Sequence, residues 1–156
     1  MKKILLLFIL TPLITFAQGA EYNIKSFLNP SVELSEKTPN THYLGNAWLN
    51  RLIPADDDFN YNLTQATFSA DSTLDWHKHS TGQVLIIIDG EGYYQERGKE
   101  VIVVKKGGII KCDKNTEHWH SSSHDSMVSY ITIYLASETI WTEKLSKIDY
   151  DKMKND

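Results

Sequence analysis

Cysteine is nearly absent from this sequence. Cys112 is the only cysteine among 156 residues, so no disulfide can form within one chain. Stability must therefore come from the burial of apolar side chains rather than from covalent cross-links. Cys112 lies in the segment GGIIKCDK, which has the composition of a strand, and we interpret it as a small buried side chain rather than as a nucleophile.

A basic patch is also absent. The chain carries 16 Lys and Arg residues against 20 Asp and Glu residues, which gives a formal net charge of −4 at pH 7. Because proteins that bind nucleic acid need clustered positive charge, this mild acidity argues against nucleic acid as a partner. The charge balance says little else about function.

No long apolar run occurs after the first residues of the chain. One apolar run, Ile4 to Phe16, follows the basic residues Lys2 and Lys3. It is shorter than the roughly 20 residues that a membrane-spanning helix needs. We therefore predict that residues 1–17 are a secretory signal peptide, the alternative being a retained N-terminal helix. The mature protein is then expected in the periplasm or outside the cell, without a membrane span.

What the chain does contain is a series of short strand-like runs. A polar segment over residues 18–44 is expected to form an N-terminal arm. After it, runs rich in Val, Ile, Tyr and Thr alternate with turns rich in Gly, Asp and Asn. Such closely spaced strands predict an all-β sandwich or barrel in one domain, residues 45–150. The acidic stretch 56–58 lacks the spaced oxygen ligands of a calcium loop, and we interpret it as a solvated loop.

Only the end of the chain has a helical signal. Ser146, with Asp149 three residues later, resembles a capping box in which Asp replaces the usual Glu or Gln. We predict a short terminal helix that runs through Lys152, with residues 151–156 as a tail.

Two pairs of histidines carry the strongest chemical signal. The segments WHKH and EHWH each place two histidines two residues apart, His77 with His79 and His118 with His120. Alternate residues of a strand point to the same face, so each pair presents two imidazoles side by side. Two imidazoles on one face can chelate one ion, and the pattern indicates a metal site. The alternative is that each histidine is an ordinary polar residue with a hydrogen bond.

The remaining histidines and the tryptophans are given simpler roles. His42 and His124 stand alone in the sequence, and we interpret both as hydrogen-bonded polar residues. Trp76 and Trp119 alternate with the paired histidines and are expected to point the other way. Together with Trp48 they are expected to fill the barrel and its interfaces rather than to bind a ligand.

The two histidine segments resemble the two signatures of the cupin superfamily. HKHSTGQVLIIIDG has the spacing H-x-H-x3-Q-x6-G, with Gln83 where glutamate is usual. GGIIKCDKNTEHWHS is similar to G-x5-P-x-G-x2-H, but Asp113 and Asn115 replace the proline and the glycine, and Ser122 replaces a later asparagine. Asn115 is expected to adopt the left-handed conformation, which asparagine tolerates better than most residues.

Within that superfamily the chain is most similar to small single-domain cupins associated with carboxymuconolactone decarboxylase domains, a group that includes bacterial cupin-type hydroxynitrile lyases. The group shares the ending W-x-E-x-x-S-x-x-x-Y, which here runs from Trp141 to Tyr150. The resemblance implies a single cupin barrel (a double-stranded β-helix, or jelly roll). It also implies a homodimer.

The resemblance further implies one metal with four protein ligands, which fall on His77, His79, Gln83 and His118. Four ligands with open positions suit Mn²⁺ or Fe²⁺ first, with Ni²⁺ or Zn²⁺ possible. Because all four ligands are neutral, the ion keeps its full charge. We therefore expect weaker metal affinity but stronger Lewis acidity than with a glutamate in place of Gln83.

His120 and Tyr130 are the candidate catalytic residues. His120 shares a face with His118 and could act as general acid or base, or it could hold a ligand or a bound water by hydrogen bonding. Tyr130 stands where the lyase-type relatives carry a catalytic histidine. It could orient substrate or donate a proton from its phenol, or it could simply pack in its strand with a satisfied hydroxyl. We expect a metal-dependent enzyme acting on a small organic molecule by lyase, isomerase or decarboxylase chemistry. The alternatives are an iron-dependent dioxygenase and a non-catalytic small-molecule-binding protein.

Overall fold

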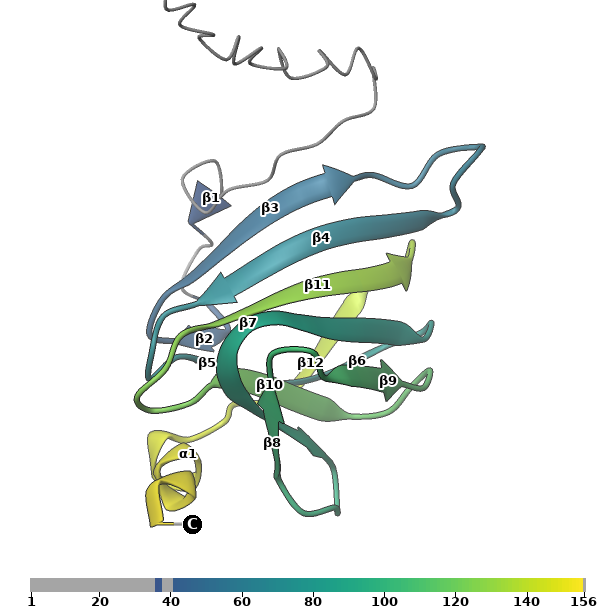
Figure 1. Cartoon of the computed structure of the whole chain (residues 1–156). Coiled ribbons are helices and arrows are strands. Elements are labelled where there is room, and N and C mark those ends of the chain that lie inside the picture. The colour runs from purple at the N-terminus through teal and green to yellow at the C-terminus, as the bar shows by residue number, and fades with distance from the viewer. Residues whose placement is uncertain (1–35, 38–40, 156) are drawn as a thin grey trace, which may run out of the picture.

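The structure is a computed structural model that describes residues 36–37 and 41–155 (Figure 1). The predicted signal peptide, residues 1–17, and most of the predicted arm, residues 18–35 and 38–40, lie outside the described residues and stay predictions. No helix in the described part of the chain is both long enough and apolar enough to cross a membrane.

One long strand, β7 (Gln83–Glu96), belongs to both walls of a barrel. Its first half pairs with β9 (Ile109–Cys112) and β11 (Val128–Leu135) in the first sheet. Its second half pairs with β8 (Ile102–Lys105) and β10 (His118–Ser122) in the second sheet. The two sheets curve away from this shared strand and enclose the core, as Figure 1 shows. This arrangement confirms the predicted all-β barrel.

Every strand pair is antiparallel. The first sheet continues from β11 through β4 (Tyr61–Phe68) and β3 (Ala47–Ile53) to β1 (Glu36–Lys37). The second sheet continues from β10 to β5 (Thr73–Leu74) and β2 (Tyr43–Leu44), and separately to β6 (Trp76–His79) and β12 (Thr139–Glu143). β2 lies at the end of the segment predicted as the arm, so these residues form part of the barrel wall.

The change of sheet within β7 occurs at Gly90. Its φ of +72° is left-handed, and a Cβ placed there would lie 1.8 Å from the backbone oxygen of Met127. Only glycine combines that conformation with so close an approach of two backbones. Gly90 is the last residue of the H-x-H-x3-Q-x6-G spacing in the first histidine segment. The fold requires glycine there, because this residue allows one strand to belong to two sheets.

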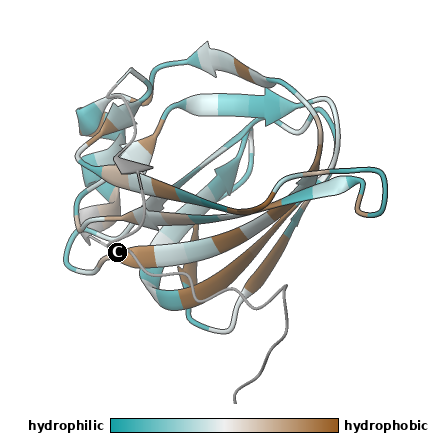
Figure 2. Cartoon of the chain, turned by 90° about the horizontal axis from the view of Figure 1, so that it is seen from above, coloured by the Kyte–Doolittle hydropathy of each residue, from teal (hydrophilic) through white to brown (hydrophobic). Residues whose placement is uncertain are grey.

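Apolar side chains alternate along the strands and fill the barrel interior. The main core includes Phe68, Leu85, Ile87, Val128 and Tyr130, which are almost completely buried. Figure 2 shows hydrophobic and less hydrophobic segments alternating along the barrel strands. This is the period of two that places every second residue of a strand on the core face.

A second, smaller core lies on the outer side of the second sheet. It contains Trp76, Trp119, Leu145 and Tyr150. The short helix α1 (Lys147–Asp151) closes over it and continues as the 3-10 helix η2 (Lys152–Asn155).

The start of α1 is capped as the sequence predicts. The hydroxyl of Ser146 accepts a hydrogen bond of 3.1 Å from the backbone N–H of Asp149. Tyr150 then points inward, is fully buried and donates from its hydroxyl to the backbone oxygen of Ser122 at 2.9 Å. The helix is therefore fixed to the back of the strand that carries His118.

Candidate metal centre

Three histidines from two neighbouring strands meet at one point inside the barrel. His77 on β6 and His118 on β10 are directly paired in the antiparallel register, and His79 follows two residues along β6. Each of the three offers a ligand atom, and these atoms all lie within 4.8 Å of one another. All three side chains are buried. The structure thus brings the two histidine segments together, in an arrangement that can hold a metal ion.

Backbone carbonyls fix the orientation of two of these rings. The Nδ1–H of His77 donates to the backbone oxygen of Asp75 at 2.8 Å, and the Nδ1–H of His118 donates to that of Thr116 at 2.9 Å. A histidine whose Nδ1 carries the proton has its lone pair on Nε2. Such hydrogen bonds behind the ring are the usual way in which proteins orient metal-binding histidines.

Two polar side-chain atoms at the site, one from His79 and one from Gln83, are buried without a hydrogen-bond partner among the described residues. Nε2 of His79 and Oε1 of Gln83 have no hydrogen bond to a described residue. An unsatisfied buried polar atom costs about 1–3 kcal/mol, so such atoms are rare unless a ligand or water uses them. A divalent transition metal would satisfy both atoms at once, because imidazole nitrogen and amide oxygen are both suitable ligands. The residues present therefore fit the metal that the sequence predicts.

Burial keeps the three histidines neutral at pH 7. Desolvation, followed by the neighbouring His118, lowers the pKa of His77 to about 3 and that of His79 to about 4. Burial also lowers the pKa of His118. Only the neutral ring has a lone pair available for a metal, so the fold holds these side chains in the state that binds one.

The turn before His118 is locked onto the first histidine strand. Asn115 has a φ of +61°, which confirms the predicted left-handed conformation, and its backbone N–H donates to the backbone oxygen of His79 at 2.8 Å. Cys112, just before this turn, is buried, with its Sγ 3.3 Å from Nδ1 of His118. The prediction that Cys112 is a small buried side chain is confirmed, and its place is directly behind a candidate ligand.

His120 lies beside the three histidines but outside the group that could share one ion. Its ring centre is 5.6 Å from that of His77, and its Nδ1 is buried without a hydrogen-bond partner. Burial is the largest cause that lowers the pKa of His120 well below its ordinary value, with His77 the next. His120 is therefore a neutral base next to the site.

Tyr130 stands behind His120 rather than at the open side of the site. Its hydroxyl donates to the backbone oxygen of Ser121 at 2.5 Å, and its ring is fully buried. The ring centre lies 5.1 Å from that of His120, nearly edge-on. Burial raises the pKa of the phenol well above its ordinary value. This geometry favours packing against His120 over direct contact with a substrate.

A cavity of about 240 Å³ opens in front of the histidines. His77, His79, Gln83 and His120 line one side of it. Hydroxyl groups reach it from Thr64, Thr132, Tyr134 and Thr139. Apolar surface comes from Leu49, Ala66, Phe68 and Leu74. The site therefore has room for a small organic molecule beside the candidate ligands.

Trp141 also lines this cavity, a position that the sequence pattern did not assign to it. Trp141 on β12 is paired with His77 in the strand register, and its ring centre lies 5.1 Å from that of His77. His42 stacks on the outer side of Trp141 at 4.1 Å and contacts Asp75 through Nδ1 at 3.3 Å. His42 has the hydrogen-bonded polar role expected of it. Its stacking on Trp141 depends on a contact between segments about a hundred residues apart, which no local pattern indicates.

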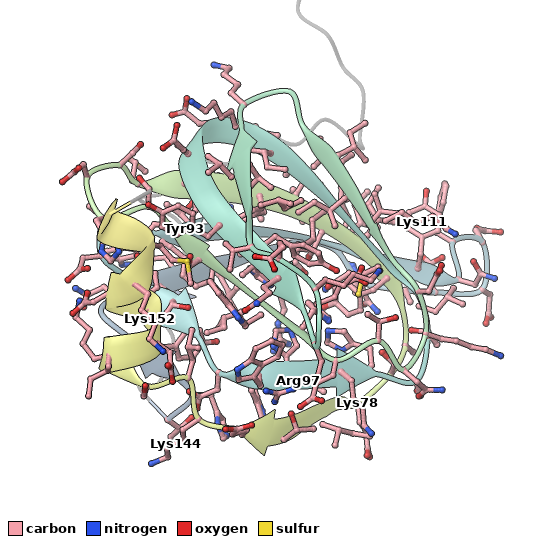
Figure 3. The ribbon with its side chains drawn as sticks, turned by 90° about the horizontal axis from the view of Figure 1, so that it is seen from below. Lys78, Tyr93, Arg97, Lys111, Lys144 and Lys152 are labelled. Atoms are coloured by element: carbon pink, nitrogen blue, oxygen red, sulfur yellow. The ribbon has the colours of Figure 1, made fainter. Side chains whose placement is uncertain are left out.

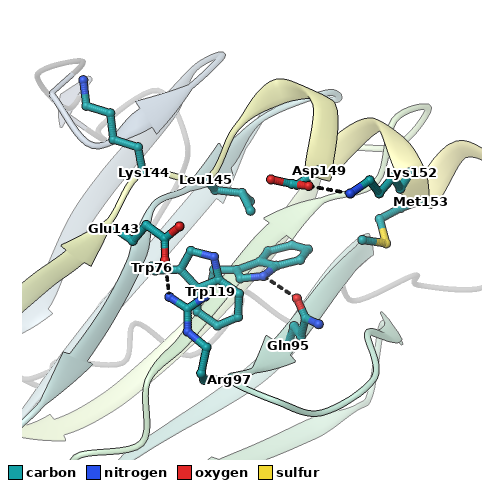
Figure 4. A pocket seen from close by; sticks show the side chains of 10 residues that line it. All are labelled: Trp76, Gln95, Arg97, Trp119, Glu143, Lys144, Leu145, Asp149, Lys152 and Met153. Carbon is teal, nitrogen blue, oxygen red and sulfur yellow. Dashed lines mark hydrogen bonds and ion pairs between the residues drawn. The ribbon is translucent and has the colours of Figure 1, made fainter.

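The opposite side of the histidine strands is closed by aromatic packing and ion pairs. The Arg97 guanidinium lies 3.7 Å above the ring of Trp76, and the indole N–H of Trp119 donates to Gln95 at 2.8 Å (Figure 4). A hollow of about 250 Å³ separates this surface from the terminal helix. Charged side chains, among them Lys78 and Lys144, extend outward from the ribbon in Figure 3. Trp76 and Trp119 thus point away from the site, as the strand period predicts.

Comparison with known proteins gives the family. The sequence profile of the cupin domain matches residues 66–134. The solved structure of a cupin-like protein from Thermotoga maritima superposes with a TM-score of 0.70 and 30% identity, over 74% of this chain and 90% of that one. The chain belongs to the cupin family. The resemblance predicted from the two histidine signatures is therefore confirmed.

Other solved structures share the cupin fold with this protein. A predicted oxalate decarboxylase from Thermotoga maritima has a TM-score of 0.61 and 16% identity, over 69% of this chain and 98% of that one. A polyketide cyclase from Streptomyces resistomycificus has a TM-score of 0.62 and 11% identity, over 82% and 93%. At such identities the likeness concerns the fold alone. Comparison with curated protein sequences gave no significant match.

Proposed function

We propose that this cupin is an enzyme that uses one divalent transition metal, held by His77, His79, Gln83 and His118, to act on a small organic substrate. The metal would serve as a Lewis acid that polarises an oxygen atom of the substrate. The observation that carries the proposal is the group of three neutral, buried imidazoles, of which His77 and His79 line one cavity together with Gln83, whose side-chain oxygen is unsatisfied.

Gln83 determines the charge of the site. The three histidines are neutral and Gln83 contributes a neutral oxygen, so the protein supplies no negative charge next to the ion. A substrate with an anionic or enolisable oxygen would be held strongly in such surroundings. We propose Mn²⁺ or Fe²⁺ as the metal, because imidazole and oxygen ligands with open positions suit both, with Ni²⁺ or Zn²⁺ as alternatives.

His120 is the proposed general base. It is neutral, lines the cavity, and has a free Nδ1. A neutral imidazole can take a proton from a carbon or hydroxyl next to the polarised oxygen and return it to another position. Tyr130 packs on the ring of His120 and holds it in place. Proton movement of this kind is common to lyase, isomerase and decarboxylase chemistry.

One observation favours a second candidate, a non-catalytic small-molecule-binding protein. No carboxylate or cysteine of a described residue lines the cavity, and no hydrogen bond connects Nδ1 of His120 to another described residue. If no protein group can remove the proton that His120 takes up, His120 depends on the substrate alone to take that proton back. A binding protein would show saturable ligand affinity without any product.

Metal analysis is the first test. The purified chain, supplemented with Mn²⁺ or with Fe²⁺ under anaerobic conditions, is expected to retain about one equivalent of metal after desalting. Less than a tenth of an equivalent with every metal tried would overturn the proposal. Replacing Gln83→Glu should raise the metal affinity, because the added negative charge lies directly beside the ion.

The acid–base role is tested separately. The metal-loaded protein is incubated in D₂O with small hydroxyketones, and exchange of carbon-bound hydrogen is followed by NMR. We expect exchange in the wild type and its loss in His120→Ala, with metal content unchanged. Exchange that persists in His120→Ala rules out His120 as the base. Metal retention and ligand binding without turnover of any compound favour the binding protein. Turnover that requires O₂ and Fe²⁺ favours a dioxygenase.

Export and dimerisation are proposed on the sequence pattern and the family resemblance alone. N-terminal sequencing of the protein recovered from the periplasm or the medium should begin after residue 17 if residues 1–17 are a signal peptide. Light scattering of the purified chain measures whether it forms the proposed homodimer.

A further inference from the structure

The cavity in front of the histidines continues into a second chamber. This outer chamber has a volume of about 400 Å³. The two chambers share the lining residues Leu49, Thr64, Tyr134 and Ser137, so they adjoin. A molecule bound at the metal site therefore has space to extend along β3, β4 and β11 toward the outer chamber.

The inner chamber has no charged wall. None of the described residues that line it is Asp, Glu, Lys or Arg. An unpaired charge is disfavoured against such a wall, because it loses water and gains no partner. A ligand that fills this chamber must therefore place its charges either at the metal or beyond the chamber.

Arg51 is the one charged side chain among the described residues that line the outer chamber. It follows Leu49 by two positions on β3, so both point to the same face, and it is paired with Thr64 in the strand register. No ion pair joins Arg51 to another described residue. In contrast, Arg97 on the opposite side of the molecule is held by two glutamates.

The nearest acidic residues in sequence do not neutralise Arg51. Asp56 to Asp58 lie in the hairpin loop beyond the end of β3 and do not line either chamber. The carboxylate of Asp56 accepts hydrogen bonds from the backbone N–H groups of Asp58 and Phe59, at 3.0 and 2.7 Å. Among the side chains that the structure describes, the exposed Arg51 guanidinium therefore has no carboxylate partner.

The strand register places Arg51 at a defined distance from the metal end. Gln83 on β7 is paired with Tyr134 on β11, which is paired with Asn62 on β4, and β3 with Arg51 is the next strand. Arg51 pairs with Thr64, two residues along β4 from Asn62. Three spacings between neighbouring strands and this two-residue offset amount to about 16 Å along the curved sheet. The side chain of Arg51 shortens this separation, so a chain of several carbon atoms can span it.

We infer that the substrate is an elongated organic acid, with an oxygen-bearing head at the metal, an uncharged middle in the inner chamber, and an anionic tail bound by Arg51. The inference rests on the proposed function, because it assumes an open metal position at the head. The planar guanidinium matches a carboxylate tail by two parallel hydrogen bonds. A ligand with a charge in its middle, or with a cationic tail, would be excluded.

The test uses two hydroxamates of equal length and the full chain loaded with Zn²⁺. Octanohydroxamate has the metal-binding head and an apolar tail, whereas suberate monohydroxamate has the same head and a terminal carboxylate. Calorimetry gives the ratio of their dissociation constants in the wild type, Arg51→Gln, Arg51→Lys and the control Arg97→Gln. We expect Arg51→Gln to weaken suberate monohydroxamate about five-fold or more relative to octanohydroxamate. Arg51→Lys should keep part of that preference, and Arg97→Gln should keep all of it.

Each outcome decides a different point. An unchanged ratio in Arg51→Gln, with both hydroxamates bound, would overturn the role of Arg51 and leave the proposed metal site intact. Failure of both hydroxamates to bind the metal-loaded wild type would contradict the proposed function itself. Because Arg51 is exposed, its replacement should leave the thermal unfolding of the chain unchanged, which separates a binding effect from misfolding.

Discussion

The two faces of the histidine strands differ in how their polar groups are satisfied. On the inner face, Nε2 of His79 and Nδ1 of His120 are buried without partners. On the outer face, the indole N–H of Trp119 has its acceptor, and the Arg97 guanidinium covers Trp76. Residues that alternate along one strand therefore serve opposite purposes. The outer face stabilises the strands, and the inner face is left free to bind.

The largest expected effect comes from the outer face. Replacing Trp119→Ala removes a fully buried indole from the second core and should lower the free energy of unfolding by about 3–5 kcal/mol. Urea denaturation of the metal-free protein measures this loss. Trp119→Phe, which keeps an aromatic ring, should lose less. A change below about 1 kcal/mol in Trp119→Ala would show that the outer face does not carry the stability assigned to it.

The next effect concerns the inner face. His79→Ala should weaken metal binding at least about 100-fold, or about 2.7 kcal/mol, while the unfolding free energy of the metal-free protein changes little. The reason is that Nε2 of His79 has no partner among the described residues, and that Nδ1 loses only a long contact of 3.4 Å with the hydroxyl of Thr139. Competition with a chromophoric chelator gives the affinity. Lys78→Ala, the adjacent residue on the other face, is the matched control and should bind metal normally.

The two faces are expected to affect the free energy of unfolding in different ranges of pH. The pKa of His77 is about 3, below its unfolded value near 6.5, so the unfolded chain takes up the proton first as pH falls. The histidine contribution is thus complete above pH 6.5 and is lost as pH falls toward 3, by at most about 1.4 kcal/mol per pH unit for one histidine. On the outer face, hydrogen bonding to Arg97 lowers the pKa of Glu117 to about 2, so its contribution is lost only below about pH 4.5.

Denaturation of the metal-free protein across this range checks the assignment. His77→Gln should flatten the curve between pH 6.5 and 4.5, whereas Glu117→Gln should alter it only below pH 4.5. If Glu117→Gln changes the unfolding free energy between pH 6.5 and 4.5, the two faces do not contribute to stability independently.

The smallest expected effect is that of Arg97→Met. Arg97 is partly exposed and bonded to Glu117 and Glu143, and such pairs contribute little because water screens them. The unfolding free energy should fall by less than about 1 kcal/mol, with metal affinity unchanged. A loss as large as that of Trp119→Ala would show that the charged cover, rather than the indole beneath it, stabilises this face.

The sequence predicted those parts of the site that depend on local period and local conformation. The period of two placed His77 and His79 on one face and Trp76 on the other, and Asn115 was expected in the left-handed conformation that it adopts. These features need only neighbouring residues. The cap of the terminal helix at Ser146 was predicted for the same reason.

Features that depend on which strands adjoin could not be predicted. Pairings between distant segments determine the stacking of His42 on Trp141 and the hydrogen bond of the Tyr130 hydroxyl to a backbone oxygen. They also determine the place of the exposed Arg51 on the lining of the outer chamber. A strand pattern shows which residues share a face, but not what that face meets. The uncharged wall of the inner chamber is likewise a property of several strands together.

The glycine bend in β7 has a consequence for how ligands reach the interior. Because one unbroken strand crosses from the first sheet to the second at Gly90, the two walls cannot slide or separate along that side. On the second sheet, β12 pairs with β6 alone among the described strands, and its Trp141 stacks on His42. We therefore expect the barrel to be most rigid along β7. A movement of β12 would shift Trp141, which lines the inner chamber, and so change the space beside the histidines.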